Sequence, residues 1–338
     1  MFAGLARPRL LPVQPIAAAL VLFATTASQM ASRASADDYP IRTVTIVAPS
    51  APGGLYSLFA RIIADKLEHA LNGTFIVENR PGAASVVGAT YVAHAVPDGY
   101  TLMIANSTTM ATNVTLHRSL PYNPASDFTP IVLIARIPEV LVVNAALPVH
   151  SIADLVALAK KTEGGLSFGS AGVGTAQHLD GEMLKTLLGI AMTHVPYRGM
   201  APAINDVAGG YIPLMFSPVT LALPLINAGK LRPLGVTAKE KIDALPDVLP
   251  LADIGVPGYD ASSWFMLVAP AQTPQPVIDK LYGTLVGLTA DADVKKQFND
   301  FGLLPVTSPP PAELKSFVQS EIARWSVIVK KAGLEGAE

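Results

Sequence analysis

Apolar residues along this chain recur with two alternating periods, one typical of strands and one typical of helices. Short apolar runs such as 43–48 and 100–105 are each linked to segments whose apolar residues return every three or four positions. The pattern predicts helices over 57–71, 86–95 and 152–161. This alternation favours strands connected by helices that cover both faces of a sheet. We therefore expect an α/β fold with two mostly parallel sheets.

The two longest apolar strands divide the chain into segments. They cover residues 140–144 and 263–269, and we expect each of them to cross between two lobes. The middle of the chain, 138–262, then forms one lobe, and the segments 37–137 and 263–338 together form the other. In such folds ligands sit between the lobes, at the carboxyl ends of strands.

The first 36 residues have the pattern of a secretory signal peptide. Arg7 and Arg9 form a basic start, 16–25 is a short apolar core, and 34–36 supplies small residues for cleavage. An uncleaved N-terminal anchor is the structural alternative. The chain contains no cysteine, so its stability rests on core burial and thiolate metal sites are excluded. We expect a cleaved signal peptide over 1–36 and a location in a bacterial periplasm.

Charge and composition exclude several classes of protein. The 338 residues carry a formal net charge of −2, which gives no basic field for nucleic acid. No internal apolar run is long enough to span a bilayer. The six histidines lack metal-ligand spacing, so we expect no metal site. His194 is predicted to be a core residue, and Asp180 is predicted to be solvated or to cap a helix.

A strand, a Ser/Gly loop and a helix are predicted in succession over 166–188. The first N–H groups of the helix, from Ala176, lack internal partners and lie at the positive end of its dipole, which favours a carboxylate or a phosphate. The loop at 49–54 opens another helix in the same way. We expect each lobe to offer one helix N-terminus to a shared anion. An ordinary turn with Thr175 as N-cap is the alternative.

Motifs for catalysis are incomplete. Ser170 is not in a nucleophile elbow, because position 168 is Phe168 instead of glycine. The glycine pair that follows lacks the third glycine of a dinucleotide loop, since Gln177 stands there. An exported serine hydrolase that uses Ser170 or Ser107 with His178 is the alternative function, and it lacks a third group to orient the histidine.

A series of ordered motifs runs through nearly the whole mature chain. The motifs are PSAPGG (49–54), ENRPGA (78–83), PDGYTL (97–102), LPYNPASDF (120–128), GSAGVGTAQHL (169–179), HVPYRG (194–199), AGKLRPLGVT (228–237) and GYDASSWFMLVAPAQTP (258–274). On these motifs the chain resembles the periplasmic solute receptors of the tripartite tricarboxylate transporter type, also called Bug receptors. The resemblance implies a two-lobed, type II-like periplasmic binding protein fold that closes on a small carboxylate.

The resemblance also implies which residues contact the ligand. One carboxylate is expected to be held between the two loops, and a further group of residues is expected to contact the rest of the ligand. The expected residues are Ser50, Ala51, Gly53, Gly54 and Ser57, then Ser170, Gly172, Gly174, Thr175 and His178, and finally Ser107, Tyr197 and Arg198. The family's first loop commonly ends in aspartate, where this chain has Ser57. We expect Ser57 to cap the helix, and the missing carboxylate weakens the case for an amino-acid ligand.

The resemblance implies a receptor instead of an enzyme. It is expected to work as a monomer without cofactor, metal or nucleic acid. Its expected partners are a small organic carboxylate and the membrane subunits of a tripartite tricarboxylate transporter. A sensor kinase is a further candidate partner, because a loaded receptor that docks on a sensor's outer domain needs the same cleft.

Overall fold

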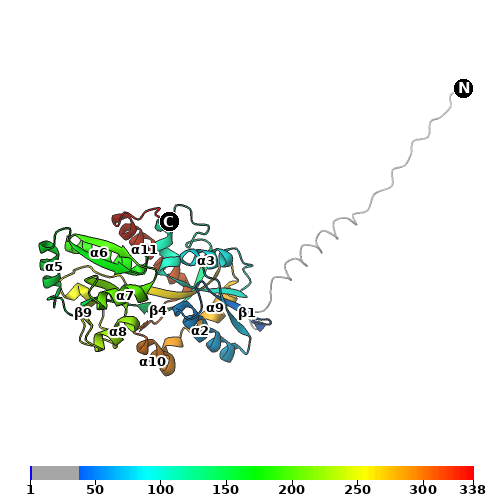
Figure 1. Cartoon of the computed structure of the whole chain (residues 1–338). Coiled ribbons are helices and arrows are strands. Elements are labelled where there is room, and N and C mark those ends of the chain that lie inside the picture. Colours follow the sequence, from blue (N-terminus) through cyan, green and yellow to red (C-terminus); the bar gives the residue numbers. More distant parts are fainter. Residues whose placement is uncertain (2–37) are drawn as a thin grey trace.

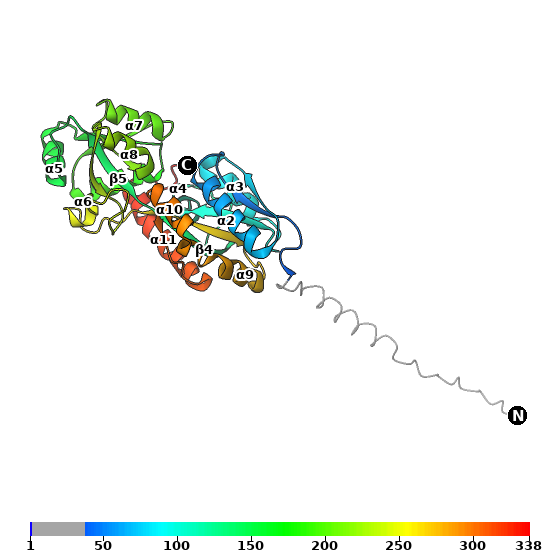
Figure 2. The same ribbon diagram turned by 90° about the horizontal axis from the view of Figure 1, so that it is seen from below.

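Two β-sheets, each with helices on both faces, make up the described part of the chain (Figure 1). The computed structural model describes Met1 and residues 38–338, so the predicted signal peptide lies, apart from Met1, outside the described residues. The two sheets with their helices lie side by side as two lobes (Figure 2). The predicted two-lobed α/β fold is confirmed. None of the described helices is both long enough and apolar enough to cross a membrane.

The first sheet has six strands in the order β11-β4-β10-β3-β1-β2. Their bounds are β1 (Val44–Ala48), β2 (Phe75–Asn79), β3 (Thr101–Asn106), β4 (Phe128–Ile137), β10 (Ser263–Pro270) and β11 (Leu304–Pro305). One face packs on α2 (Leu55–Leu71), α9 (Gln275–Leu285) and α10 (Ala292–Asp300). The other face packs on α3 (Val86–Ala93) and the first half of α11 (Pro311–Lys331). Shorter helical segments are η2 (Ala83–Ser85), the π-helix η3 (Thr108–Thr112), α4 (Asn113–Leu116) and η5 (Leu288–Ala290).

The second sheet has five strands in the order β7-β6-β8-β5-β9. Their bounds are β5 (Glu139–Asn144), β6 (Leu166–Ser170), β7 (Met192–Pro196), β8 (Leu214–Pro218) and β9 (Leu231–Val236). One face packs on α5 (Ile152–Lys161) and α6 (Ala176–Leu188). The other packs on α7 (Met200–Ala208) and α8 (Val219–Asn227), and η4 (Leu251–Asp253) follows β9. Each lobe is therefore a three-layered unit in which apolar strands are covered from both sides.

Both sheets are mixed, which corrects the prediction of mostly parallel sheets. The parallel pairs are β1 with β2 and β3, and β6 with β7 and β8. Next to the lobe connections the pairs are antiparallel: β10 pairs with β3 and β4, β11 with β4, and β5 with β8 and β9. The reason is that strands that enter a sheet from the other lobe are not joined to their neighbours by a helical crossover, so nothing forces them to be parallel.

The two extended connections between the lobes are short. β4 ends at Ile137 and β5 begins at Glu139, so the chain changes sheet at Pro138, which has no N–H to donate to a ladder. The predicted crossing strand 140–144 pairs only with strands of the second sheet. The predicted strand 263–269 is part of β10, which pairs only within the first sheet, so the chain crosses just before Ser263.

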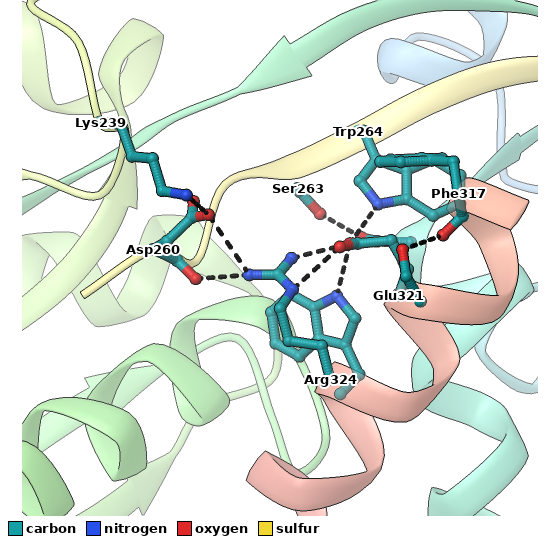
Figure 3. A network of polar contacts seen from close by, with 10 residues as sticks. Lys239, Asp260, Ser263, Trp264, Phe317, Glu321 and Arg324 are labelled. Carbon is teal, nitrogen blue, oxygen red and sulfur yellow. Dashed lines mark hydrogen bonds and ion pairs between the residues drawn. The ribbon is translucent and has the colours of Figure 1, made fainter. Parts of the chain in front are cut away.

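The long helix α11 packs on both lobes. Its residues Leu314 and Val318 belong to the core cluster of the first sheet, whereas Trp325 and Val329 belong to that of the second. Polar contacts also join α11 to its surroundings. Figure 3 shows Arg324 of α11 between Asp260 and Glu321. Arg324 donates to the Asp260 carbonyl and, at 2.7 Å, to Glu321, which also accepts from Trp264 Nε1 at 2.7 Å. α11 therefore holds the two lobes together in addition to the two extended connections.

Candidate functional site

A cavity of about 440 Å³ lies between the two lobes. Both lobes and the connections between them line this cavity. The first lobe contributes Leu55, Ala83, Asn106, Thr108, Leu116 and His117, and the second contributes 173–177 and Pro218. The residues next to the connections are Ile137, Glu139, Ser263 and Phe265, and Glu338 also lines the cavity. A larger cavity of about 820 Å³ is lined by residues of α6 and α11 and of the segments before β10, among them apolar side chains such as Met183 and charged ones such as Arg324. We take the inter-lobe cavity as the candidate site because a helix N-terminus opens into it.

That N-terminus belongs to α6. Its first N–H groups, from Ala176, Gln177 and His178, have no partner within the helix because of helical geometry. Ala176 and Gln177 line the cavity. Thr175 occupies the N-cap position, as predicted, but its side chain does not cap the helix. The positive end of the α6 dipole is therefore open to an anion in the cavity.

The loop that precedes α6 is held by hydroxyl groups. Ser170, at the end of β6, is fully buried, donates to the Gly172 carbonyl at 2.9 Å and accepts from the Gly172 N–H at 3.0 Å. The Thr175 hydroxyl donates to the same carbonyl at 2.8 Å. Gly172 and Gly174 have φ values of 139° and 72°, a region that glycine adopts without strain. Local hydrogen bonds and glycine together define the path of this loop.

Two stacked histidines support the loop from behind. The rings of His178 and His194 are parallel, with centroids 3.6 Å apart, and Phe168 lies beside them. His178 Nδ1 accepts the Gly174 N–H at 3.1 Å, so this nitrogen carries no proton, while His194 Nε2 lies 2.6 Å from Ser170 Oγ. Burial is the main cause that lowers the pKa of each imidazole to about 4. Both rings are therefore neutral at neutral pH, and His178 lies behind the cavity lining instead of in it.

This arrangement also rules out the pair proposed for a serine hydrolase. The Ser170 hydroxyl contacts His194 and not His178, and it is buried beneath the loop instead of being exposed to a substrate. The sequence predicts His194 to be a core residue; its ring stacks and is hydrogen-bonded, but the residue is half-buried instead of buried. Ser107 is likewise buried, and its hydroxyl contacts that of Ser263.

The first lobe's loop, Ser50–Gly54, is more open. Residues 51–54 are exposed, and a methyl group added at Gly53 or Gly54 would have no neighbour within 4 Å. Asn79 Nδ2 donates to the Ser50 carbonyl at 2.9 Å and to Ser57 Oγ at 2.7 Å. These bonds tie the loop to α2. The start of α2 contributes Leu55 to the cavity lining.

The expectation that Ser57 caps α2 is wrong. The helix begins at Leu55, its N-cap residue is Gly54, and no side chain caps it. Ser57 therefore lies in the first turn, where its buried hydroxyl accepts from Asn79 instead. The start of the helix is two residues earlier than the apolar pattern indicated, because Leu55 and Tyr56 pack against the first lobe's core.

Tyr197 and Arg198 belong to the second lobe, in the loop between β7 and α7. The Tyr197 hydroxyl donates to Asp206 at 2.7 Å, and burial together with Asp206 raises the pKa of this phenol to about 12. Arg198 is exposed. Among the thirteen predicted residues, all in the described part of the chain, Gly174 and Thr175 line the cavity and the other eleven do not.

Sequence reasoning missed two buried acids beside the α6 N-terminus. Glu139 lines the cavity and is 3 % exposed, and Asp180 is fully buried, which contradicts the prediction that Asp180 is solvated. Burial raises the pKa of Glu139 to about 8, and the hydrogen bond from Gln177 opposes this rise. The one sequence signal is that Glu139 interrupts an apolar run directly after Pro138.

The charges in the cavity are unusual for an anion site. None of the described residues that line it is lysine or arginine, and its titratable residues are His117, Glu139 and Glu338. No group of three or more His, Asp or Glu side chains in the described part of the chain could hold a metal ion. The hydrogen-bond donors that this cavity offers to an anion are backbone N–H groups and hydroxyls instead of a cationic side chain.

Comparison with known proteins gives a consistent result. The profile of the tripartite tricarboxylate transporter family receptor, TctC, matches residues 59–334. BugT of Bordetella pertussis is 32% identical over 317 residues, which are 94% of this chain and 97% of BugT. Rpa4515 of R. palustris, solved with adipate, is 36% identical, has a TM-score of 0.76, and is matched over 87% of this chain and 98% of Rpa4515.

A second solved structure supports the same assignment. MatC from Rhodopseudomonas palustris, with bound malate, is 32% identical and has a TM-score of 0.73. The match covers 86% of this chain and 100% of MatC. BugD, solved as a periplasmic binding protein, is 34% identical to this chain and has a TM-score of 0.73 over 88% of this chain and 99% of BugD. The chain therefore belongs to the tripartite tricarboxylate transporter family receptors and is a solute-binding receptor.

Proposed function

We propose that this receptor captures a small organic carboxylate in the inter-lobe cavity and delivers it to the membrane subunits of a tripartite tricarboxylate transporter. The observation that supports this most is the open N-terminus of α6, whose residues Ala176 and Gln177 line the cavity. The similarity to structures that contain adipate and malate agrees with a carboxylate ligand.

In this proposal one ligand carboxylate binds the α6 N-terminus and the Gly174–Thr175 backbone. His178 and Ser170 contribute by holding the loop, and the exposed Arg198 meets a second carboxylate when the ligand has one. The loop Ser50–Gly54 closes over the ligand from the first lobe with its backbone N–H groups and hydroxyl. Ligand contacts to both lobes then stabilise the closed state.

We further propose that the receptor is exported to the periplasm as a monomer after cleavage of residues 1–36. The lobes are proposed to divide at 137/138 and 262/263, which agrees with the strands of each sheet. Because α11 contacts both cores, closure in this proposal bends the chain near Pro138 and Ser263 while α11 keeps its contacts with each lobe.

A thermal-shift screen of the full chain against small carboxylates tests the proposal. A ligand at roughly a hundred times its dissociation constant adds about 2.7 kcal/mol to the free energy of unfolding, which raises the melting temperature. We expect a shift with at least one dicarboxylate whose concentration stays constant during incubation. A ligand that is consumed, or no shift with any acid, would contradict a carboxylate receptor.

Two variants test where the ligand binds. Thr175→Ala removes the hydroxyl that donates to the Gly172 carbonyl, and we expect weaker binding because the loop is then held by fewer bonds. Thr162→Ala is the matched control. Thr162 is the C-cap residue of α5 and does not line the cavity, and its hydroxyl donates to the Leu158 carbonyl of the same helix. If Thr175→Ala and Arg198→Ala both bind as tightly as the natural chain, the proposed placement of the site is wrong.

A further inference from the structure

Glu139 occupies a special position in the candidate site. It is the first residue of β5, directly after the lobe connection at Pro138, and it lines the inter-lobe cavity. Its backbone is fixed on both sides by Thr237, whose hydroxyl accepts the Glu139 N–H at 2.8 Å and whose N–H donates to the Glu139 carbonyl at 2.9 Å. The side chain is therefore held at the base of the cleft, where the two lobes meet.

The carboxyl group of Glu139 is only half satisfied. Gln177 Nε2 donates to Oε1, whereas Oε2 is buried and has no hydrogen-bond partner among the described residues. A buried polar atom without a partner costs about 1–3 kcal/mol, so its retention calls for an explanation. Because Gln177 is also one of the first residues of α6, the unsatisfied oxygen lies beside the helix N-terminus that is open to the cavity.

A second acid beneath Glu139 adds to the unfavourable charge. Asp180, one turn along α6 from Gln177, is fully buried, and neither of its carboxyl oxygens has a partner in the described chain. Burial and then the charge of Glu139 raise the pKa of Asp180 well above its usual value, and Arg324 lowers it. The Tyr259 hydroxyl donates to the Asp180 backbone carbonyl at 3.0 Å and leaves the carboxyl group unsatisfied.

The protonation state of Glu139 affects whether a ligand carboxylate can bind next to it. Two neighbouring carboxyl groups in one buried site cannot both ionise without a large penalty, and a ligand carboxylate at the α6 N-terminus adds a third. An ionised Glu139 would repel that carboxylate. A protonated Glu139 instead offers an Oε2–H donor, and the ligand carboxylate supplies the acceptor that the protein lacks.

We propose that Glu139 is a ligand-contacting residue that binds the organic acid in its protonated form, so that each captured carboxylate keeps one proton in the cleft. This inference rests on the proposed carboxylate-binding function and names a residue that determines its specificity. It predicts a preference for fully anionic acids over ligands with an ammonium group at this position, because an ammonium would need the ionised form.

The charged and titratable groups around Glu139 are few. Asp180 comes from α6, Arg324 from α11, Tyr259 from the segment before β10, and His117 and Glu338 from the cavity wall. Burial places the pKa of Glu139 at about 8, close to the pH of ordinary binding assays. A ligand that binds only the protonated form should lose affinity once the pH exceeds this value.

Isothermal titration calorimetry on the full chain, with adipate and malate as probes, tests the inference. Both acids are fully ionised between about pH 6.5 and pH 9, so their own titration does not contribute. Affinity should fall about tenfold between pH 7 and pH 9, because the competent fraction of the receptor falls by that factor. Glu139→Gln, a neutral analogue of the protonated acid, should keep the affinity seen at pH 7 and lose the pH dependence. Glu163→Gln, in the exposed turn after α5, is the control and should keep the natural slope.

The outcomes separate the inference from the function on which it rests. Tight binding at pH 6.5 with an affinity that is flat or rises towards pH 9 would overturn the role of Glu139 and leave the receptor function intact. An unchanged slope in Glu139→Gln would overturn it as well. If neither probe nor any other carboxylate bound at any pH, both the function and the inference would fail.

A measurement on the natural chain alone covers the case in which Glu139→Gln does not fold. Binding enthalpies in buffers of different ionisation enthalpy report proton uptake directly. Near pH 8 we expect uptake of about half a proton per ligand, because about half of the free receptor is then ionised at Glu139. No uptake at this pH would overturn the proposal.

Discussion

The two strand–loop–helix junctions that face the cavity look alike in sequence but are held in different ways. In the first lobe, a side chain added at Gly53 or Gly54 would meet nothing within 4 Å. In the second lobe, a methyl group at Gly174 would lie 2.5 Å from Leu116 of the opposite lobe, and the Gly174 N–H is bound to His178. A glycine-rich loop is therefore preorganised only where side chains from elsewhere in the fold support it.

The largest effect that would distinguish the junctions is expected from Gly174→Ala. Alanine at φ 72° is strained by about 1–3 kcal/mol, and its methyl group also displaces the buried Leu116 side chain. We expect ligand affinity to fall by about tenfold or more, measured by calorimetry with adipate. Gly53 also has a positive φ, but a methyl group there has no close neighbour. Gly53→Ala should therefore lower the affinity only through backbone strain. Equal losses in both variants would contradict the difference between the junctions.

Ser170→Ala should be next in size and should act on stability. It removes the hydroxyl that contacts Gly172 and His194, which are both half-buried, and each lost hydrogen bond costs about 0.5–1.5 kcal/mol. The midpoint of urea unfolding should move to a lower concentration with an unchanged slope. In the first junction Ser50→Ala should change the free energy of unfolding by less than about 0.5 kcal/mol, since its partially exposed hydroxyl contacts only the adjacent carbonyl.

Acid should destabilise the second junction selectively. The pKa of His178 and His194 in the folded chain is about 4, below the ordinary value of 6.5, so the unfolded chain binds protons first. Their contribution to the free energy of unfolding is therefore complete above about pH 6.5 and is lost as the pH falls towards 4, by at most about 1.4 kcal/mol per group and pH unit. Urea unfolding at pH 7 and pH 4.5 measures this, and His194→Gln should reduce the loss.

Two further variants complete that pH experiment. His69→Gln is the control, because His69 is exposed and lies in the last turn of α2, outside the second junction. Glu139 has the opposite sign: its pKa is raised from 4.5 to about 8, so its contribution to stability is complete below about pH 4.5 and declines as the pH rises through 8. Between about pH 4.5 and pH 8 the free energy of unfolding should therefore decline less in Glu139→Gln than in the natural chain. An acid loss equal in the natural chain and in His194→Gln would show that the histidine stack does not titrate as inferred.

Arg198→Ala should have the smallest effect. The residue is exposed, so the free energy of unfolding should change by less than about 0.5 kcal/mol. Screened by solvent, its contact with a second carboxylate should contribute about 1 kcal/mol or less. We expect adipate affinity to fall by about fivefold at most and the affinity of a monocarboxylate to stay the same. An equal loss for both acids would place Arg198 near the first carboxylate instead.

Local sequence pattern was sufficient for most elements of the fold. The helices over 152–161 and 176–188 form with the predicted bounds, because their periodicity and end signals involve only neighbouring residues. The ordered motifs identified the family, and the helix N-terminus at Ala176 follows from the same short stretch. The sequence by itself therefore determined most elements, the family and the position of one proposed anion site.

Only the tertiary structure decided what surrounds that site. Ser170 meets His194 across 24 residues, Ser57 meets Asn79 across 22, and Gln177 meets Glu139 across 38. Burial of a polar side chain depends on such distant segments, and it sets both hydrogen bonding and pKa. The fully buried Asp180 looks like any solvated acid in its own helical turn. Its environment, and with it the inferred proton in the cleft, exists only because β5, α6 and α11 pack together.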